Sequence, residues 1–306
     1  MFYLNATLLL FFSAAALQVQ AQENLLATDE TKQRTAAPTT TKELKSLLHK
    51  DAPSLPLVSA HRGGPNIGFP ENCIATFEHT IDAGFAMLEV DPRRTADDQF
   101  VLFHDSKLQR MSNATGNLNQ VTLEALENVK LQDYRGNLTP HTIPKLDEAI
   151  AWAKGKCVLV LDSKDVSIAE RIAAIQRQNA ESWVMMICYT TASAKECYAA
   201  NPDVMMEVGV TSQKQFDEFD ASGIPWSSVV AFVGHHSPVD AKLIAAIHDK
   251  GACCMAGTSR NLDRELLHAT DENRGQIEQQ YRKLVEIGVD IIETDLPIAV
   301  MKIIQK

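Results

Sequence analysis

The fold is constrained most by an alternation of short β-rich runs and amphipathic helical segments, which starts near residue 55 and continues through the chain. Residues 72–83 illustrate the helical segments, because Ile74, Phe77 and Ile81 share one helical face and Gly84 follows at a C-cap position. The alternation predicts a parallel sheet covered by helices. The strand candidates are residues 57–60, 87–90, 157–161, 184–188, 204–208, 229–233, 252–255 and 289–292.

One further β-rich run, residues 100–103, follows Asp91 too closely for the crossover of about a dozen residues that parallel neighbours need. We therefore expect residues 92–150 to form an insertion after the second strand, which leaves eight parallel strands. Eight strands close a barrel, so the predicted fold is a TIM-like (β/α)8 barrel that spans residues 53–306 as a single domain. An open doubly wound sheet is the alternative.

The residues before the barrel divide into two segments. The apolar run at residues 8–17, followed by Val19-Gln20-Ala21, is typical of a signal peptide over residues 1–21 with cleavage after Ala21. The run is shorter than the ~20 residues of a spanning helix, and a lipoprotein or uncleaved anchor is the alternative. Residues 22–52 are polar and Thr-rich, without the spacing that would bury a face, and predict a polar linker or N-terminal arm, either a tether or a frayed helix.

These segments predict an exported protein, periplasmic or secreted, without a stable membrane span. The formal net charge of −10 argues against a nucleic-acid partner, which would require a basic surface. The cysteine spacing matches neither a zinc pattern nor a disulfide framework, so buried free thiols are expected, with a Cys188–Cys197 bridge as the alternative.

Two predicted strands end in residues that can act as acids, bases, phosphate-binding groups or metal ligands. His61 and Arg62 follow the first strand, at the end of the barrel that carries active sites. Glu89 and Asp91 alternate on one face of the second strand. If that face points into the barrel, the two carboxylates require a cation, and a hard divalent ion suits oxygen ligands. The alternative is a face in contact with solvent.

The same end of the barrel is expected to receive further polar groups. Asp162 and Lys164 follow the third strand, with Asp162 placed as another inward carboxylate and a rim salt bridge as the alternative. His104 ends the β-rich run of the insertion and brings a second imidazole to the mouth. Two histidines beside a metal and a lysine suit general acid–base cleavage of a phosphodiester.

For other polar residues near strand ends the sequence predicts no catalytic or metal-binding role. His235 and His236 follow a strand and are expected to have a loop or rim role. Glu207 and Glu293 lie within strands and can face the barrel, but the sequence offers no partner for either.

Several short elements, taken in chain order over residues 57–300, resemble the signature of glycerophosphodiester phosphodiesterases, within the superfamily of phospholipase C-like barrel phosphodiesterases. These elements are His61-Arg62-Gly63, Pro70-Glu71-Asn72, Glu89-x-Asp91, Thr95, His104-Asp105, Ile143-Pro144-x-Leu146, Asp162-x-Lys164 and Thr294-Asp295-x-Pro297. Sphingomyelinase D-type phospholipases are similar in the His, Glu-x-Asp and Asp-x-Lys elements.

The resemblance implies one divalent cation, Ca²⁺ or Mg²⁺, held by Glu89, Asp91 and Asp162. It implies that Glu71 supports this site through a water or behind the ligands.

The resemblance also implies that His61 and His104 are the acid–base pair. Arg62 and Lys164 would neutralise the phosphoryl oxygens. The implied reaction converts a small-molecule glycerophosphodiester into glycerol 3-phosphate and an alcohol, a step of lipid metabolism. Alternatives are a lysophospholipase D or sphingomyelinase D activity, and a non-catalytic barrel that binds a phosphate ester.

The sequence departs from the family pattern in four places. Cys73 stands where Thr is usual, Asp98 stands where a turn Gly is usual, and Asp162 stands where Glu is common. Asp still tolerates a positive φ at the turn. The stretch of residues 253–258 replaces the usual seventh strand, a region that helps to form the substrate pocket.

Overall fold

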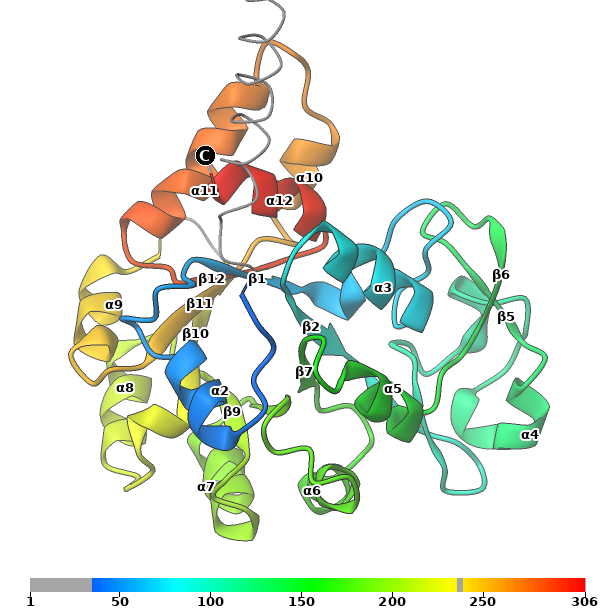
Figure 1. Cartoon of the computed structure of the whole chain (residues 1–306). Coiled ribbons are helices and arrows are strands. Elements are labelled where there is room, and N and C mark those ends of the chain that lie inside the picture. Colours follow the sequence, from blue (N-terminus) through cyan, green and yellow to red (C-terminus); the bar gives the residue numbers. More distant parts are fainter. Residues whose placement is uncertain (1–34, 236–238, 306) are drawn as a thin grey trace, which may run out of the picture. The chain divides into compact units, whose positions relative to one another are not determined.

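The computed structural model describes residues 35–235 and 239–305. The predicted signal peptide, its cleavage site and residues 22–34 of the predicted arm lie outside the described residues, as does His236. Parallel strands close into an eight-stranded barrel, so the predicted TIM-like fold is confirmed (Figure 1). In the order of hydrogen-bonded neighbours the strands are β1 (Leu57–Ala60), β12 (Ile291–Thr294), β11 (Cys253–Gly257), β10 (Val229–Gly234), β9 (Met205–Gly209), β8 (Val184–Cys188), β7 (Val158–Leu161) and β2 (Met87–Val90).

The barrel strands are buried on both faces, which explains their nearly continuous apolar sequence. Along β7, Val158 and Val160 join the cluster inside the barrel, whereas Leu159 and Leu161 join the cluster under the helices. Side chains inside the barrel thus come from every second residue. Methionine, valine and isoleucine fill the lower part, so the interior is a packed core beneath the mouth.

Helices surround the barrel and cover its outer face (Figure 1). They are α3 (Ile74–Ala83), α5 (Leu146–Ala153), α6 (Ile168–Arg177), α7 (Thr191–Ala200), α8 (Gln213–Asp220), α9 (Ala241–His248), α10 (Leu262–Leu267), α11 (Arg274–Glu286) and α12 (Pro297–Ile304), with the 3-10 turn η4 (Trp226–Ser228) before β10. Local sequence sets several boundaries. Ser167 and Glu170 form a capping box at the start of α6, and Pro297 occupies the first position of α12.

The last part of the predicted arm is helical, as in the alternative of a frayed helix, but it buries one face, which the sequence interpretation did not expect. Residues Thr41–Leu47 form helix α2, which begins with a capping box between Thr40 and Glu43. Leu44 and Leu48, one helical turn apart, are 0% and 2% exposed and belong to the cluster inside the barrel. Two leucines thus suffice to bury one face of an otherwise polar segment, and α2 closes the end of the barrel where the strands begin.

The chain between β2 and α5 leaves the barrel and forms a lobe beside α3 and α5 (Figure 1). The lobe has its own apolar cluster, which includes Val101, Phe103 and Leu131. The expected hairpin geometry is present at Asp98, whose φ is 56°. The lobe contains two antiparallel pairs, β3 (Pro92–Arg94) with β4 (Phe100–Leu102) and β5 (Lys130–Gln132) with β6 (Leu138–Thr142), and the short elements η2 (Leu108–Arg110), η3 (Leu118–Gln120) and α4 (Leu123–Leu126).

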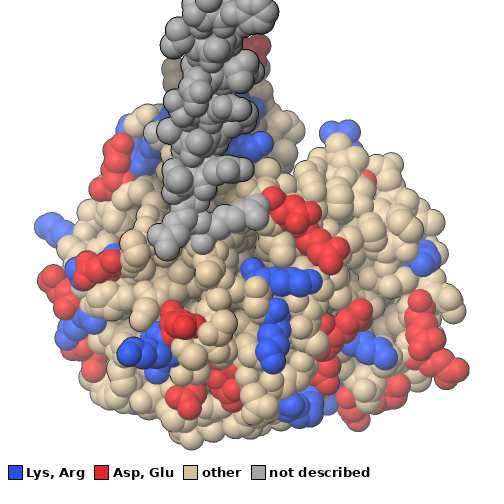
Figure 2. All heavy atoms as spheres, in the orientation of Figure 1, with Lys and Arg blue, Asp and Glu red and all other residues tan. Residues whose placement is uncertain are grey.

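All six cysteines are free and buried, as predicted. Within the described ranges no helix has the length and apolar character to cross a bilayer. Acidic and basic side chains are interspersed on the face of the molecule in Figure 2.

Candidate active site

The mouth of the barrel begins with a tight turn after β1. The 3-10 turn η1 (His61–Gly63) contains Arg62 at φ 53° and Gly63 at φ 82°. A Cβ on Gly63 would lie 2.4 Å from the ring of Phe77, so the close approach of α3 requires glycine there. The turn aims the Arg62 backbone N–H at Glu89 Oε2, 2.7 Å away. The first two strands are thereby joined at the site.

Three carboxylates gather at the ends of β2 and β7. Glu89, Asp91 and Asp162 are each under 5% exposed, and one oxygen of each lies within 4.8 Å of one oxygen of the others. Burial, followed by the charges of Asp91 and Asp162, raises the pKa of Glu89 well above its ordinary value. A cluster of buried carboxylates of this kind is compatible with a cation among its oxygens.

Lys164 supplies part of that positive charge. Its Nζ lies 3.1 Å from Asp91 Oδ1 and 2.5 Å from Asp162 Oδ2. Burial lowers the pKa of Lys164, but the two carboxylates outweigh burial and leave its pKa raised. Two neutral side chains complete the contacts: the Tyr189 hydroxyl donates to Asp162, and Asn72 Nδ2 donates to Asp91 Oδ2 at 2.6 Å.

Both predicted histidines are held at Nδ1 by an aspartate. His61 Nδ1 lies 2.6 Å from Asp295 Oδ1, and His104 Nδ1 lies 2.7 Å from Asp105 Oδ1. An N–H at Nδ1 leaves Nε2 of each ring for a reacting group. Burial lowers the pKa of His61, but the bond to Asp295 and the charge of Glu293 outweigh it, so the pKa is raised. Burial lowers the pKa of His104, and Asp91 and Asp105 only partly oppose this effect.

Glu71 does not belong to the group of three carboxylates. It is 7% exposed and binds two arginines, with Oε2 accepting from Arg62 Nη1 at 3.0 Å and Oε1 accepting from Arg110 Nη2 at 2.6 Å. Arg110 also donates through Nε to Asp105 Oδ2 at 2.5 Å. Arg110 therefore connects the partner of Arg62 with the partner of His104. The sequence interpretation missed Arg110, because it lies in an irregular part of the insertion without a motif.

A second missed residue is Asp263 on α10. Its carboxylate is 1% exposed and accepts hydrogen bonds from the hydroxyls of Thr258, Tyr281 and Thr294 and from the backbone N–H of Asp295. Asp263 therefore fixes the loop that presents Asp295 to His61. The signal that could have identified Asp263 from the sequence is its position as an acidic residue between Leu262 and Leu266, on the buried face of a short helix.

The predicted site residues surround a cavity of ≈530 Å³ at the mouth of the barrel. His61, Arg62 and His104 line it together with Glu89, Asp162 and Lys164. Asp91 lies beneath, in contact with Lys164. A neighbouring cavity of ≈710 Å³ shares His61, Arg62 and Asp295 with the lining of the smaller one. Glu71 lines this second cavity, which has no carboxylate of the cluster. The smaller cavity is therefore the one that joins the carboxylates to both histidines.

His235, for which the sequence favoured a loop or rim role, lines the same cavity. Its ring packs edge-on against Phe232, with 4.8 Å between ring centroids. Glu207 and Glu293 also line the cavity, so both carboxylates that the sequence left without an assignment face inward.

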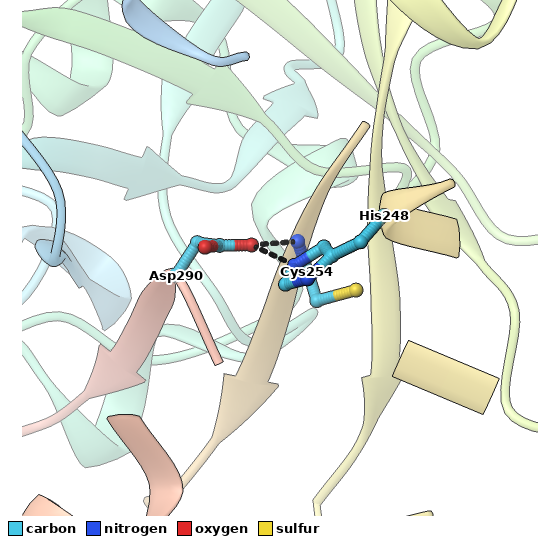
Figure 3. A group of neighbouring side chains, drawn as sticks. All are labelled: His248, Cys254 and Asp290. Atoms are coloured by element: carbon cyan, nitrogen blue, oxygen red, sulfur yellow. Dashed lines mark hydrogen bonds and ion pairs between the residues drawn. The ribbon is translucent and has the colours of Figure 1, made fainter. Parts of the chain in front are cut away.

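A second group with metal-ligand side chains lies at the opposite end of the barrel (Figure 3). Asp290 Oδ2 lies 2.8 Å from His248 Nε2 and accepts from the Cys254 backbone N–H at 2.7 Å. The thiol of Cys254 approaches Ile244 O at 4.0 Å, and burial raises its pKa. Asp290 and His248 satisfy each other without an ion. This group joins α9 to β11 and β12 and does not contribute to the mouth.

A TIM barrel whose mouth combines buried carboxylates, a lysine and paired histidines has the architecture of a barrel phosphodiesterase. The sequence model of the glycerophosphoryl diester phosphodiesterase family matches residues 61–299. The chain belongs to this family and is a phosphoric diester hydrolase.

Individual relatives agree with this assignment. The crystal structure of a glycerophosphoryl diester phosphodiesterase from Parabacteroides distasonis is 39% identical, with a TM-score of 0.83 over 89% of this chain and 93% of that chain. A glycerophosphodiester phosphodiesterase of Caldanaerobacter subterraneus is 25% identical over 82% of this chain and 98% of its own length. An Oleispira antarctica phosphodiesterase, solved in complex with the product sn-glycerol-3-phosphate, is 22% identical and shares the fold with a TM-score of 0.63 over 82% of this chain and 98% of that chain.

Proposed function

We propose that this phosphodiesterase hydrolyses glycerophosphodiesters to glycerol 3-phosphate and an alcohol, with a divalent cation and two histidines. The main supporting observation is one cavity that joins the carboxylate cluster, through Glu89 and Asp162, to two histidines that are each oriented by an aspartate. Binding of a phosphate ester alone requires neither imidazole, so this pairing favours catalysis over a binding role.

The proposed cation is Ca²⁺ or Mg²⁺, held by Glu89, Asp91 and Asp162. Oxygen ligands match both ions, and buried carboxylates within 4.8 Å of one another provide a donor set of suitable spacing. The ammonium of Lys164 lies against two of the three carboxylates, which indicates that this position favours positive charge. When bound, the cation would polarise the phosphoryl group and orient it.

The two histidines are proposed to divide the proton transfers. Their opposite pKa shifts suit different roles, because a raised pKa favours the protonated form of His61 and a lowered pKa favours the neutral form of His104. His61 then donates a proton from Nε2 to the oxygen of the departing alcohol, and His104 accepts a proton at Nε2 from the attacking 2-hydroxyl of the glycerol group. Water then opens the resulting cyclic phosphate to glycerol 3-phosphate. Asp295 and Asp105 hold the rings in these tautomers and stabilise their protonated forms.

Arg62 and Lys164 are proposed to stabilise the charge that develops on the phosphoryl oxygens. Glu71 holds the Arg62 guanidinium in place through the bond at 3.0 Å, and it is proposed to act behind the ligands in this way. We also propose that the protein is exported to the periplasm or the outside of the cell, on the sequence of residues 1–21.

The proposed reaction is tested with EDTA-treated protein and a panel of glycerophosphocholine, glycerophosphoethanolamine and glycerophosphoinositol. We expect glycerol 3-phosphate to appear only after Ca²⁺ or Mg²⁺ is restored. Lysophosphatidylcholine and sphingomyelin are included in parallel. Release of an alcohol from these lipids, without release from any member of the panel, would replace the proposed substrate class with a lipid. Full activity in EDTA would contradict the metal requirement.

A further inference from the structure

Two buried carboxylates of the cavity have no direct contact assigned to them in the proposed chemistry, although the charge of Glu293 helps to raise the pKa of His61. Glu207 on β9 is 4% exposed and Glu293 on β12 is 5% exposed. Neither carboxylate has a hydrogen bond or an ion pair within residues 35–235 and 239–305, and Glu207 Oε2 is fully enclosed without a partner. A buried ionisable group without a partner is costly and therefore requires an explanation.

The barrel register places the two carboxylates deep in the mouth. Glu207 is paired in register with Val230 on β10 and Ile187 on β8, and Glu293 is paired with Ser59 on β1. Two residues earlier on the same strands, Met205 and Ile291 belong to the apolar interior. Glu207 and Glu293 therefore stand directly above the packed core, as the floor of the cavity.

The floor is close enough to the chemistry to contact a bound substrate. The cavity that Glu207 and Glu293 line also contains His61, His104 and Asp162. After burial, which is the first cause, the charge of Asp162 contributes to the raised pKa of both carboxylates, and the charge of Glu293 contributes to that of Glu207. When the phosphoryl group of a substrate lies near the two histidines, a small group attached to it can therefore reach Glu207 and Glu293.

We propose that Glu207 and Glu293 form a subsite for the terminal hydroxyl of the glycerol group, the hydroxyl that takes no part in the reaction. This inference rests on the proposed function. A hydroxyl donates one hydrogen bond to a carboxylate and needs little space, which suits a closed floor. The larger and more variable alcohol group then points to the open side of the mouth, where the partly exposed Tyr189 and the polar residues Gln215 and Arg264 line the cavity.

The subsite has a consequence for specificity. An acyl ester at the terminal position has no hydroxyl to donate, and its chain would meet the apolar core beneath Glu207. A site built for a hydrogen bond rejects an analogue that lacks the donor far more strongly than an apolar pocket rejects an added group. The enzyme is therefore expected to prefer deacylated glycerophosphodiesters over 1-acyl lysophospholipids.

The test combines a substrate change with a residue change. Glycerophosphocholine is compared with the analogue that lacks only the terminal hydroxyl and keeps the 2-hydroxyl. Wild-type enzyme is expected to lose about 10- to 100-fold in kcat/KM on the analogue. Glu207→Leu is expected to lose a similar factor on glycerophosphocholine and to hydrolyse both compounds equally. Glu278→Gln, in the neighbouring cavity, is the control and is expected to keep the wild-type ratio.

A binding measurement keeps the inference testable without turnover. Calorimetry compares sn-glycerol 3-phosphate with propane-1,2-diol 1-phosphate, which lacks the terminal hydroxyl, on wild-type and Glu207→Leu protein of equal melting temperature. An unchanged preference in Glu207→Leu, in both assays, would overturn the subsite. A loss of activity in Glu207→Leu that is confined to substrates whose alcohol carries a positive charge would also overturn the subsite, and it would assign Glu207 to the recognition of that alcohol. If no glycerophosphodiester is hydrolysed, the proposed function fails, and the calorimetric comparison still decides the subsite.

Discussion

Replacement of Glu89 by Gln provides a thermodynamic test of the proposed metal site. In wild-type protein a cation at about 100 times its dissociation constant adds about 2.7 kcal/mol to the free energy of unfolding. One kcal/mol corresponds to roughly 2–4 °C in Tm for a domain of about this size. Saturating Ca²⁺ or Mg²⁺ is therefore expected to raise Tm by about 5–10 °C above the Tm in EDTA.

The Glu89→Gln variant is expected to keep or raise Tm in the absence of metal and to reduce the gain in Tm that metal provides. Without metal it melts at or above the wild-type temperature, because burial and the charges of Asp91 and Asp162 both oppose ionisation at residue 89. The amide oxygen still accepts from the Arg62 backbone N–H that Glu89 Oε2 binds at 2.7 Å. With metal, the variant lacks one charged ligand, and its increase in Tm is expected to fall below about 3 °C at the same metal concentration.

The assay is a thermal melt of EDTA-treated protein over a titration of CaCl2 or MgCl2. Glu278→Gln serves as the matched control, since Glu278 lies outside the carboxylate cluster and its only ion pairs in the described ranges are with Arg274 and Arg282. An equal metal-induced shift in Glu89→Gln and wild-type protein would refute the assignment of Glu89 as a ligand. A lower Tm of the variant in EDTA would refute the argument from charge.

The remaining predictions address catalysis and the base of the barrel. His61→Ala and His104→Ala are each expected to lower kcat by about 10²- to 10⁴-fold with unchanged Tm, measured by glycerol 3-phosphate release. Asp295→Asn removes the negative charge that, next to His61 Nδ1, helps to raise the pKa of His61, so the alkaline limb of the pH–rate profile is expected to shift to lower pH. Leu44→Ala is expected to lose about 2–5 kcal/mol in urea unfolding with unchanged kcat at 25 °C, because its fully buried side chain closes the barrel far from the mouth.

Each of these predictions would be contradicted by a different result. Near-full activity of either histidine variant would remove that residue from the proposed acid–base pair. An unshifted or more alkaline limb in Asp295→Asn would mean that His61 is not the acid. A stability loss under about 1 kcal/mol in Leu44→Ala would show that α2 is not an essential part of the interior.

The sequence was sufficient for the fold because each barrel strand is short, apolar on both faces and separated from the next by a helical pattern. The same alternation placed Glu89 and Asp91 on one face, and in the structure Glu89 lines the cavity while Asp91 contacts Lys164. Periodicity failed for α2, since a single pair of leucines in a Thr-rich segment is too weak a pattern to separate from a tether.

Site residues that act through long-range contacts could not be found from local patterns. Asp295 and His61 are separated by 234 positions, and their pairing exists only after the barrel closes between β12 and β1. Arg110 joins Glu71 and Asp105 from an irregular turn, where neither spacing nor a motif marks it. The sequence thus predicted groups that gather at strand ends, but it did not predict the groups that orient them.

The burial of all six thiols has a consequence for how the chain must reach its native state. Once the barrel has closed, oxidants in solvent have little access to these sulfurs, and burial raises the pKa of Cys73, Cys157, Cys253 and Cys254 and so disfavours the reactive thiolate. In the unfolded chain every thiol is accessible, and Cys253 and Cys254 are adjacent in sequence. Folding therefore competes with oxidation, and recovery of the unfolded protein should depend on reductant whereas survival of the folded protein should not.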